Sequence, residues 1–284
     1  MKRIGIVANF TKPAAADAVS RLAEYWVGRG VTVTSADDVP GGLERMISSA
    51  PVAGADLVFA LGGDGTMLRA VRLMGDQQAP VVGVNLGGLG FLTTVTVDRL
   101  EPALSLLERG QYGISKRVIL RCTIRRAQTG EVSEYHALND FAMGWGETTR
   151  VATLEVAVNG EAVTSYVCDG LIVSTPTGST GHSLSAGGPI VHPGCNVMIV
   201  NPICPHTLSN RPLILSADSV VEVQVGDTPK RLLFSADGQQ HERVAEGDCL
   251  TVKKSVRTAH IVFLESTRYF ALLRHKLHWR GSSV

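Results

Sequence analysis

The stretch ADLVFALGGDGTMLRAVRLM, residues 55–74, decides the fold of this chain. Its first part, ADLVFAL, is a short apolar run typical of a buried strand, and its last part, TMLRAVRLM, has helical spacing. The glycine turn GGDGT joins the two. A strand, a glycine turn and a helix start in direct succession predict a phosphate site, because backbone N–H groups converge there and glycines let the phosphate approach.

Asp64 stands in the centre of this turn. A carboxylate beside bound phosphates is repelled unless a metal ion or a proton-transfer role compensates. Asp64 is therefore interpreted as a base for an attacking hydroxyl, as a partner of magnesium, or, in an ordinary turn, as the cap of the helix. Arg69 follows five residues later, where its guanidinium can reach an anionic ligand or solvent.

Strand-like and helix-like segments alternate on both sides of this stretch. The expected segments are 4–8, 14–27, 31–34, 56–61, 66–74 and 80–84. Strands that alternate with helices predict an open, mostly parallel α/β sheet with ligands at the carboxyl ends of its strands. We place this nucleotide-binding domain at residues 1–97.

Beyond a helical segment at residues 98–109 the pattern changes to short alternating runs separated by Gly, Asn and Asp. In VAVNGEAV the pair Asn159–Gly160 predicts a two-residue hairpin turn. We expect an all-β, sandwich-like domain at residues 98–267. Residues 268–284 return to helical spacing, which predicts a C-terminal helix that packs back on the N-terminal domain.

The composition excludes several classes of function. With 27 basic and 26 acidic residues the net charge is +1, so no field of one sign steers the chain onto nucleic acid or a membrane. No run of 18 apolar residues is present, and the first apolar run is too short for a signal peptide. The five cysteines are odd in number and lack CxxC spacing, which favours free thiols and a cytoplasmic location.

Three further polar segments are candidate ligand sites. VNLGGLGFLT, residues 84–93, follows the next strand and is either a second glycine loop of the site or a mobile connection. DGLIVSTPTGSTGHSLSAGGPI, residues 169–190, is rich in hydroxyls and exposed amides that suit ribose and phosphate oxygens. Leu138–Asp140, LND, is either an ordinary turn or a pair that brackets an adenine edge or ribose hydroxyls.

Taken together, these four segments resemble the NAD kinase family in order and spacing. The resemblance covers nearly the whole chain, including PICPHTLSNRPLIL at residues 202–215 and the closing RYFALLRHKLHW. GGDG by itself is shared with diacylglycerol kinase, sphingosine kinase and phosphofructokinase relatives, whereas STPTGST is much more specific.

The resemblance implies transfer of the ATP γ-phosphoryl group to the 2′-hydroxyl of the adenosine ribose of NAD. It implies an active site between the two domains and across a subunit interface, in a homodimer or homotetramer. By the same resemblance Asp64 is the base that accepts the hydroxyl proton, and a divalent cation, Mg²⁺ first, accompanies ATP. In this mechanism the ATP phosphates lie over Gly62 and Gly63, and Thr66 of the same turn is a further nucleotide-binding residue. The residues that the resemblance places near the dinucleotide are Gly65, Arg69, Asn139, Asp140, Arg150, Val167, Asp169, Thr180, Gly181, His182, Ser183, Leu184, Ser185 and Gln239.

Two places depart from the family pattern. The family usually reads STAYS where this chain reads STGHS, so Gly181 and His182 replace alanine and tyrosine. His182 can still stack on a base or donate to a phosphate, but the preference between NAD and NADH is open. Val167 stands where relatives often carry a basic or polar side chain.

Two alternatives to NAD kinase stay open. A lipid or sugar kinase could use the same GGDG turn, but it would need an acyl cavity or sugar-specific groups in place of the polar STPTGST segment. A non-catalytic sensor of NAD or NADP could keep the fold without turnover, which the intact Asp64 disfavours. Small-molecule substrates, and neither nucleic acid nor membrane, are the expected partners.

Overall fold

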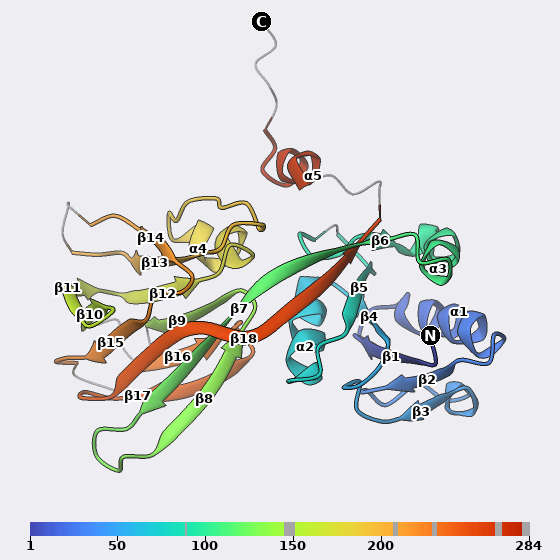
Figure 1. Ribbon diagram of the computed structural model, residues 1–284, viewed down its shortest axis with the longest axis horizontal. Helices are drawn as coiled ribbons and strands as arrows, with labels where there is room; N and C mark the ends of the chain where they lie inside the picture. The colour runs from blue at the N-terminus through green and yellow to red at the C-terminus, as the bar shows by residue number, and fades with distance from the viewer. Residues whose placement is uncertain (89, 145–150, 207–209, 229–231, 265–268, 280–284) are drawn as a thin grey trace, which may run out of the picture. The chain divides into compact units, whose positions relative to one another are not determined.

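The protein is described from a computed structural model, which covers residues 1–88, 90–144, 151–206, 210–228, 232–264 and 269–279. The chain forms two compact units (Figure 1). Unit 1 comprises residues 1–116 together with residues 259–284, and unit 2 comprises residues 117–258. Unit 1 is therefore built from both ends of the sequence.

The sheet of unit 1 is parallel. Its strands lie in the order β3-β2-β1-β4-β5, with bounds Ile47–Ser49, Thr32–Ser35, Arg3–Ala8, Leu57–Gly62 and Pro80–Asn85. Each neighbouring pair is parallel. The short strand β6, Val95–Thr96, pairs with the end of β5, and His260 and Ile261 of strand β18 pair with its beginning. This arrangement leaves the carboxyl end of β4 beside that of β5.

Helices cover both faces of this sheet. Helices α1, Ala15–Val27, and α3, Leu100–Glu108, pack on one face, where their leucines and alanines join alternate side chains of β1 and β4 in one core. Helix α2, Asp64–Met74, packs against β4 and β5 with side chains that lie outside that core. Two 3₁₀ turns, Leu43–Arg45 and Val97–Arg99, complete the connections.

Unit 2 is built from antiparallel strands in two sheets. One sheet has the order β14-β13-β12-β9-β16-β17, with bounds Leu213–Ser216, Val197–Ile203, Gly170–Ser174, Asp140–Gly144, Leu232–Ala236 and Gln240–Val244. The other contains β11, Glu161–Cys168; β10, Ala152–Val158; β15, Val221–Val225; β18, Cys249–Phe263; β7, Gly113–Arg125; and β8, Val132–Ala137. Buried side chains from both sheets, such as Phe141 and Phe234 on one and Leu154 and Leu250 on the other, form a single core.

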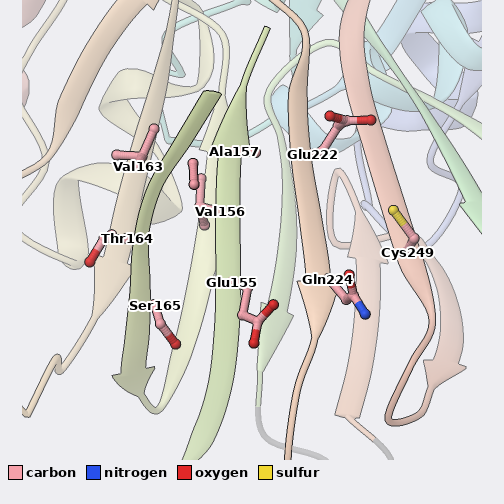
Figure 2. Close-up of a pocket in the computed structure, with 10 residues that line it drawn as sticks. Glu155, Val156, Ala157, Val163, Thr164, Ser165, Glu222, Gln224 and Cys249 are labelled. Atoms are coloured by element: carbon pink, nitrogen blue, oxygen red, sulfur yellow. The ribbon is translucent and has the colours of Figure 1, made fainter. Parts of the chain in front are cut away.

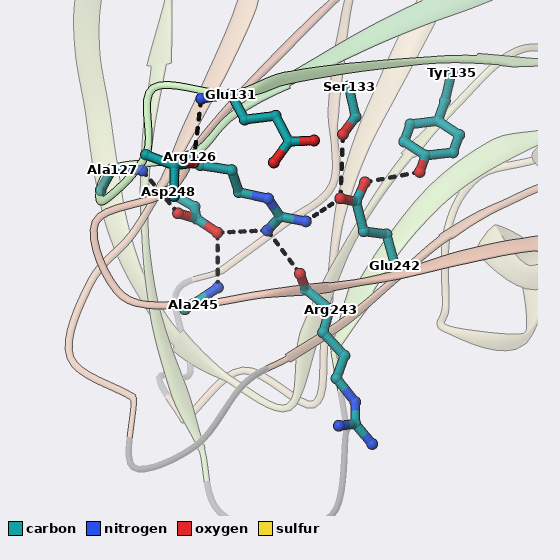
Figure 3. A network of polar contacts seen from close by, with 10 residues as sticks. Arg126, Ala127, Glu131, Ser133, Tyr135, Glu242, Arg243, Ala245 and Asp248 are labelled. Atoms are coloured by element: carbon teal, nitrogen blue, oxygen red, sulfur yellow. Dashed lines mark hydrogen bonds and ion pairs between the residues drawn. The ribbon is translucent and has the colours of Figure 1, made fainter.

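A network of ion pairs and hydrogen bonds around Arg126 links strand ends within this unit (Figure 3). The Arg126 guanidinium forms ion pairs with Glu242 and Asp248 and also donates to the carbonyl of Arg243 at 2.6 Å. Glu242 additionally accepts the hydroxyl of Tyr135 at 2.7 Å. Burial alone would raise the pKa of Asp248, but N–H donors and Arg126 outweigh it, so that pKa is lowered. The network ties the end of β7 to β17 and to the start of β18.

The predicted fold class is confirmed. The alternating segments of the first hundred residues form a parallel α/β sheet, and the later segments form antiparallel strands around a sandwich core. Val158 pairs with Glu161 around Asn159 and Gly160, both with positive φ, as the hairpin prediction requires. The tail forms helix α5, Tyr269–Lys276, in which Leu273 is buried. Among the described residues, no helix has the length and apolar character needed to span a bilayer.

Sequence patterns did not predict that β7 and β18 each run from one unit into the other. Strand β18 pairs with β15 through its first residues and with β5 through its last. Its apolar alternation is that of any strand, and nothing in that pattern indicates a change of partner along its length.

Candidate functional site

Asp64 lies at the carboxyl end of a parallel strand, as expected. Strand β4 ends at Gly62 and helix α2 begins at Asp64. One carboxylate oxygen of Asp64 accepts the N–H of Phe91 at 2.8 Å, and the other accepts the N–H of Leu92 at 2.9 Å. These two bonds hold the carboxylate in one orientation at the start of the helix.

The second glycine cluster supplies those two donors. A β-carbon on Gly90 would lie 2.0 Å from Oδ1 of Asp64, so only glycine allows the loop to approach this closely. The side chain of Asn85 holds the loop with two hydrogen bonds. Its amide N–H donates to the carbonyl of Gly88 at 2.9 Å, and its amide oxygen accepts the N–H of Gly87 at 2.7 Å. Neither interpretation of this cluster from the sequence included its contact with Asp64. Phe91 lies 27 positions after Asp64, and a local sequence pattern carries no information on a contact over that separation.

A cavity of about 420 Å³ adjoins the glycine turn. Of the predicted residues it brings together Gly63, Gly65, Thr66 and Arg69, and it adds Asn9 and Lys12 from the loop after β1. The guanidinium of Arg69 forms a 2.6 Å ion pair with Asp37 and donates to the carbonyl of Ala8 at 3.0 Å. Arg69 is thus held in place at the cavity wall by groups that sequence reasoning did not name.

The LND segment of unit 2 forms a tight turn between β8 and β9. The carboxylate of Asp237 accepts the N–H groups of Leu138, Asn139 and Asp140 at 2.9, 2.7 and 3.2 Å. On the other side Thr175 donates its N–H to the carbonyl of Asn139 at 2.8 Å. The turn is therefore held by the polar loop that follows β12 and by the turn between β16 and β17.

Two side chains of this turn, those of Asn139 and Asp140, can still accept hydrogen bonds. The side-chain oxygen of Asn139 is buried and has no hydrogen-bond partner among the residues that the structure describes. Asp140 is 5% exposed, and burial, followed by the charge of Asp237, raises the pKa of its carboxyl to about 7. A buried amide oxygen next to a buried carboxyl group can bind hydrogen-bond donors such as ribose hydroxyls.

The raised pKa of Asp140 has a consequence for stability. The folded state holds the Asp140 proton more tightly than the unfolded state, so stability is lost as pH rises from about 4 through about 7. Asp140→Asn should therefore raise the free energy of unfolding at pH 8 by on the order of 2–4 kcal/mol and leave it nearly unchanged near pH 4. Denaturant unfolding of both proteins at the two pH values checks this, and an equal gain at both would contradict the stated origin.

The STPTGST segment packs directly against LND. A β-carbon on Gly178 would lie 2.2 Å from the carbonyl oxygen of Asn139, so glycine is required at this contact. The segment continues as a 3₁₀ turn, Gly178–Thr180, and the short helix α4, His182–Ser185. Ser183 is fully buried, and the amide of Asn201 donates to its carbonyl at 3.0 Å, which fixes the start of α4.

His182 lies at the wall of a second cavity, of about 310 Å³. The remaining lining is mostly apolar and comes from strands β9, β13 and β16, with Met143, Ile203 and Leu233 among it. A mostly apolar lining that includes one imidazole suits an aromatic base. Thr180, Gly181, Leu184 and Ser185 flank His182 on the same short segment.

Of the other predicted residues of unit 2, Val167 lies in strand β11 and Asp169 lies in the bend between β11 and β12. Val167 accepts the N–H of His206 at 2.9 Å through its carbonyl, and Asp169 donates its N–H to Ile203 at 3.0 Å. The side chain of Asp169 forms a hydrogen bond with the thiol of Cys204 and raises its pKa. Gln239 lies in the same turn as Asp237. Arg150 lies outside the described residues.

Another cavity lies on the antiparallel strands of unit 2. It measures about 500 Å³ and lies over strands β10, β11, β15 and β18 (Figure 2). Its lining includes the carboxylates of Glu155 and Glu222 and none of the predicted site residues. It lacks a glycine turn and a helix start, and its carboxylates would repel phosphate groups, so we do not assign nucleotide binding to it.

Comparison with known proteins agrees with this reading of the two units. Residues 4–112 match the family model of the ATP-NAD kinase N-terminal domain, and residues 138–264 match that of the ATP-NAD kinase C-terminal domain. The NAD kinase of Citrifermentans bemidjiense is 40% identical over 98% of this chain and 99% of its own length. The NAD kinase of Moorella thermoacetica is 39% identical over 99% of this chain and 91% of its own length.

The chain belongs to the NAD kinase family. Solved structures of relatives share its fold: yeast NADH kinase complexed with NADH superposes with a TM-score of 0.91 at 27% identity, covering 100% of this chain and 89% of that one. An NAD kinase from Archaeoglobus fulgidus in complex with ATP gives a TM-score of 0.74 at 26% identity, covering 98% and 100%. The resemblance stated from the sequence motifs is therefore confirmed for this member of the NAD kinase family.

Proposed function

We propose that this member of the NAD kinase family transfers the γ-phosphoryl group of ATP to the 2′-hydroxyl of the adenosine ribose of NAD, giving NADP and ADP. The observation that carries the proposal is the fixed Asp64 carboxylate at the glycine turn before α2, beside a cavity lined by Lys12 and Arg69. Phosphoryl transfer depends mainly on positioning and charge neutralisation, and these groups supply both.

Asp64 acts as the base in this proposal. Each of its oxygens accepts one backbone N–H and keeps a second lone pair, which can receive the proton of the ribose hydroxyl. Lys12 and Arg69, together with the N–H groups at the start of α2, bind anionic phosphate oxygens. The turn formed by Gly62, Gly63 and Gly65 lets a phosphate approach the backbone.

A divalent cation is compatible with this arrangement. The described residues contain no group of three or more His, Cys, Asp or Glu side chains that could hold a metal ion by themselves. The remaining lone pairs of Asp64 fit the hydrogen-bond donors of a cation's water shell, and the nucleotide phosphates would supply the direct ligands. When bound, the cation neutralises phosphate charge, and we propose Mg²⁺ for this role.

The dinucleotide is recognised by unit 2 in this proposal. Asn139 and Asp140 accept ribose and base donors, and the cavity beside His182 takes an aromatic base. Thr180–Ser185, Val167, Asp169 and Gln239 complete the surroundings, and Arg150 is proposed with them. The protein is proposed to be cytoplasmic and to act as a homodimer or homotetramer.

A substrate panel tests the proposal. The purified chain is incubated with ATP, Mg²⁺ and, in separate reactions, NAD, NADH, diacylglycerol, sphingosine and fructose 6-phosphate, and each phosphorylated product is quantified. NADP or NADPH should be the main product. Phosphorylation of a lipid or sugar in its place would favour the other GGDG kinases, and tight NAD binding without product would favour a sensor.

The acceptor preference is a second question for the same panel. The structure of the yeast relative is a complex with NADH, and this chain carries His182 in the lining of the base cavity. The ratio of kcat/KM for NAD to that for NADH measures the preference directly. Polyphosphate in place of ATP identifies the range of donors.

A further inference from the structure

Asp237 makes an unusual set of contacts with the LND turn. Its two carboxylate oxygens accept the backbone N–H groups of three consecutive residues, Leu138, Asn139 and Asp140, at 2.9, 2.7 and 3.2 Å. The N–H of Asp237 in turn donates to the carbonyl of Asp140 at 2.9 Å. One residue therefore satisfies every N–H of LND, although it lies almost one hundred positions away in the sequence.

The hairpin between β16 and β17 places Asp237 for these contacts. Ala236 pairs with Gln240, and Gln239 donates its N–H to the carbonyl of Ala236 at 3.0 Å, which closes the turn. Asp237 and Gly238 have φ values of 52° and 66°, the left-handed conformation that a tight hairpin turn requires. Aspartate tolerates this conformation better than most residues, and here its side chain reaches across to β9.

The other side of LND is held independently. Thr175 donates its N–H to Asn139 at 2.8 Å and its hydroxyl to the carbonyl of Leu138 at 2.5 Å. Thr175 thus binds two of the LND carbonyls, and Asp237 binds the third carbonyl and all three N–H groups, so the backbone of LND is fixed. The side chains of Asn139 and Asp140 are then the groups of this turn that remain available to a ligand.

We propose that Asp237 is a positioning residue for the dinucleotide: it holds the backbone of LND so that Asn139 and Asp140 present their side-chain acceptors to NAD. The inference rests on the proposed function, and nothing in the mechanism above depends on it. Asp237 acts through the backbone of LND, because its carboxylate oxygens accept three consecutive backbone N–H groups. Its effect is exerted through the alignment of its two neighbours.

Asp237→Gly isolates the contribution of the carboxylate. Glycine adopts positive φ without strain, so the hairpin turn is kept while all three side-chain bonds are lost. Because three hydrogen bonds to a charged group are lost together, loss of alignment should raise KM for NAD about 10- to 100-fold. KM for ATP should change less than about threefold, since the ATP groups proposed above lie in unit 1.

The hairpin turn at Asn159 provides a matched control. Asn159 also has positive φ, at 53°, and its side-chain oxygen accepts a backbone N–H, that of Val220, at 2.8 Å. Asn159→Gly removes a comparable side chain from a comparable turn that carries no predicted site residue. It should leave both KM values unchanged.

Asp237→Asn provides a milder variant. Asparagine keeps the left-handed turn and one acceptor oxygen but turns an amide donor toward a backbone N–H. KM for NAD should rise by an intermediate factor, which keeps the test informative if Asp237→Gly does not fold. A merely structural role would lower the folded fraction or raise both KM values alike, and thermal unfolding of each variant separates these effects.

The outcomes distinguish this inference from the proposed function. A folded Asp237 variant whose KM for NAD stays within about twofold of wild type overturns the inference and leaves the function standing. Calorimetric titration with NAD gives a Kd that does not depend on turnover. A wild type that binds NAD without making NADP overturns the proposed function, while the Kd of the variants still decides the inference. A wild type without NAD affinity overturns both.

Discussion

Asp64→Asn should lower kcat by about 100- to 10,000-fold, the usual contribution of a positioned general base. Asparagine preserves the size of the side chain and one acceptor oxygen, but it cannot take the proton of the ribose hydroxyl at neutral pH. Because most of the residues proposed to bind NAD lie in unit 2, the Kd for NAD should stay within a few fold of wild type. Steady-state assays and calorimetry measure the two quantities.

Asp17→Asn is the matched control for that experiment. Asp17 also lies in the first turn of a helix, α1, but it is exposed and pairs only with Arg21 in the contacts described for it. An exposed pair of this kind contributes little to stability, so this variant should keep normal turnover. Near-normal turnover in Asp64→Asn would remove Asp64 as the base and leave it the structural role of binding the N–H groups of Phe91 and Leu92, since its side chain makes no cap bond to the helix.

Gly90→Ala should also lower kcat, by about 100-fold or more. The added β-carbon would lie 2.0 Å from Oδ1 and 2.7 Å from Cγ of Asp64, so either the carboxylate or the loop has to move. Movement of the loop breaks the bonds that Phe91 and Leu92 donate, and a misplacement of about 1 Å in a catalytic group costs about 100-fold in rate. Turnover with saturating substrates is the measurement.

Gly88→Ala controls for the substitution itself. It changes a glycine of the same loop, and its β-carbon would have no neighbouring atom within 4 Å. Activity close to wild type is expected there. If the two alanine variants lose activity equally, the loop acts through its general flexibility and the close approach of Gly90 to Asp64 is not the reason.

The sequence predicted the parts of this fold whose signals are local. Apolar runs that alternate with helical spacing predicted the parallel strands and the two faces of helices, and GGDGT located the turn between β4 and α2. Asn159–Gly160 predicted its hairpin because such a pair takes up positive φ at both positions. In each case, the physical cause and the structural effect lie within a few residues of one another.

Contacts between distant segments were not predictable in this way. The sequence around Gly90 or Asp237 does not indicate which residue each of them contacts. Asp64 and the LND turn come close to them only in the folded protein. Arg69 was expected at an anionic ligand or in solvent, and the structure pairs it with Asp37 from the loop after β2. The family resemblance predicted roles for individual residues, but it did not predict the hydrogen bonds and ion pairs that position those residues.

Unit 1 contains both ends of the chain, so it cannot complete its folding until the chain is almost fully synthesised. The beginning of β5 pairs with His260 and Ile261, which are synthesised only after all of unit 2. Until then the open edge at Pro80 and Val81 is an unpaired template that can recruit another chain. A nascent or truncated chain that stops before β18 would therefore be prone to aggregation.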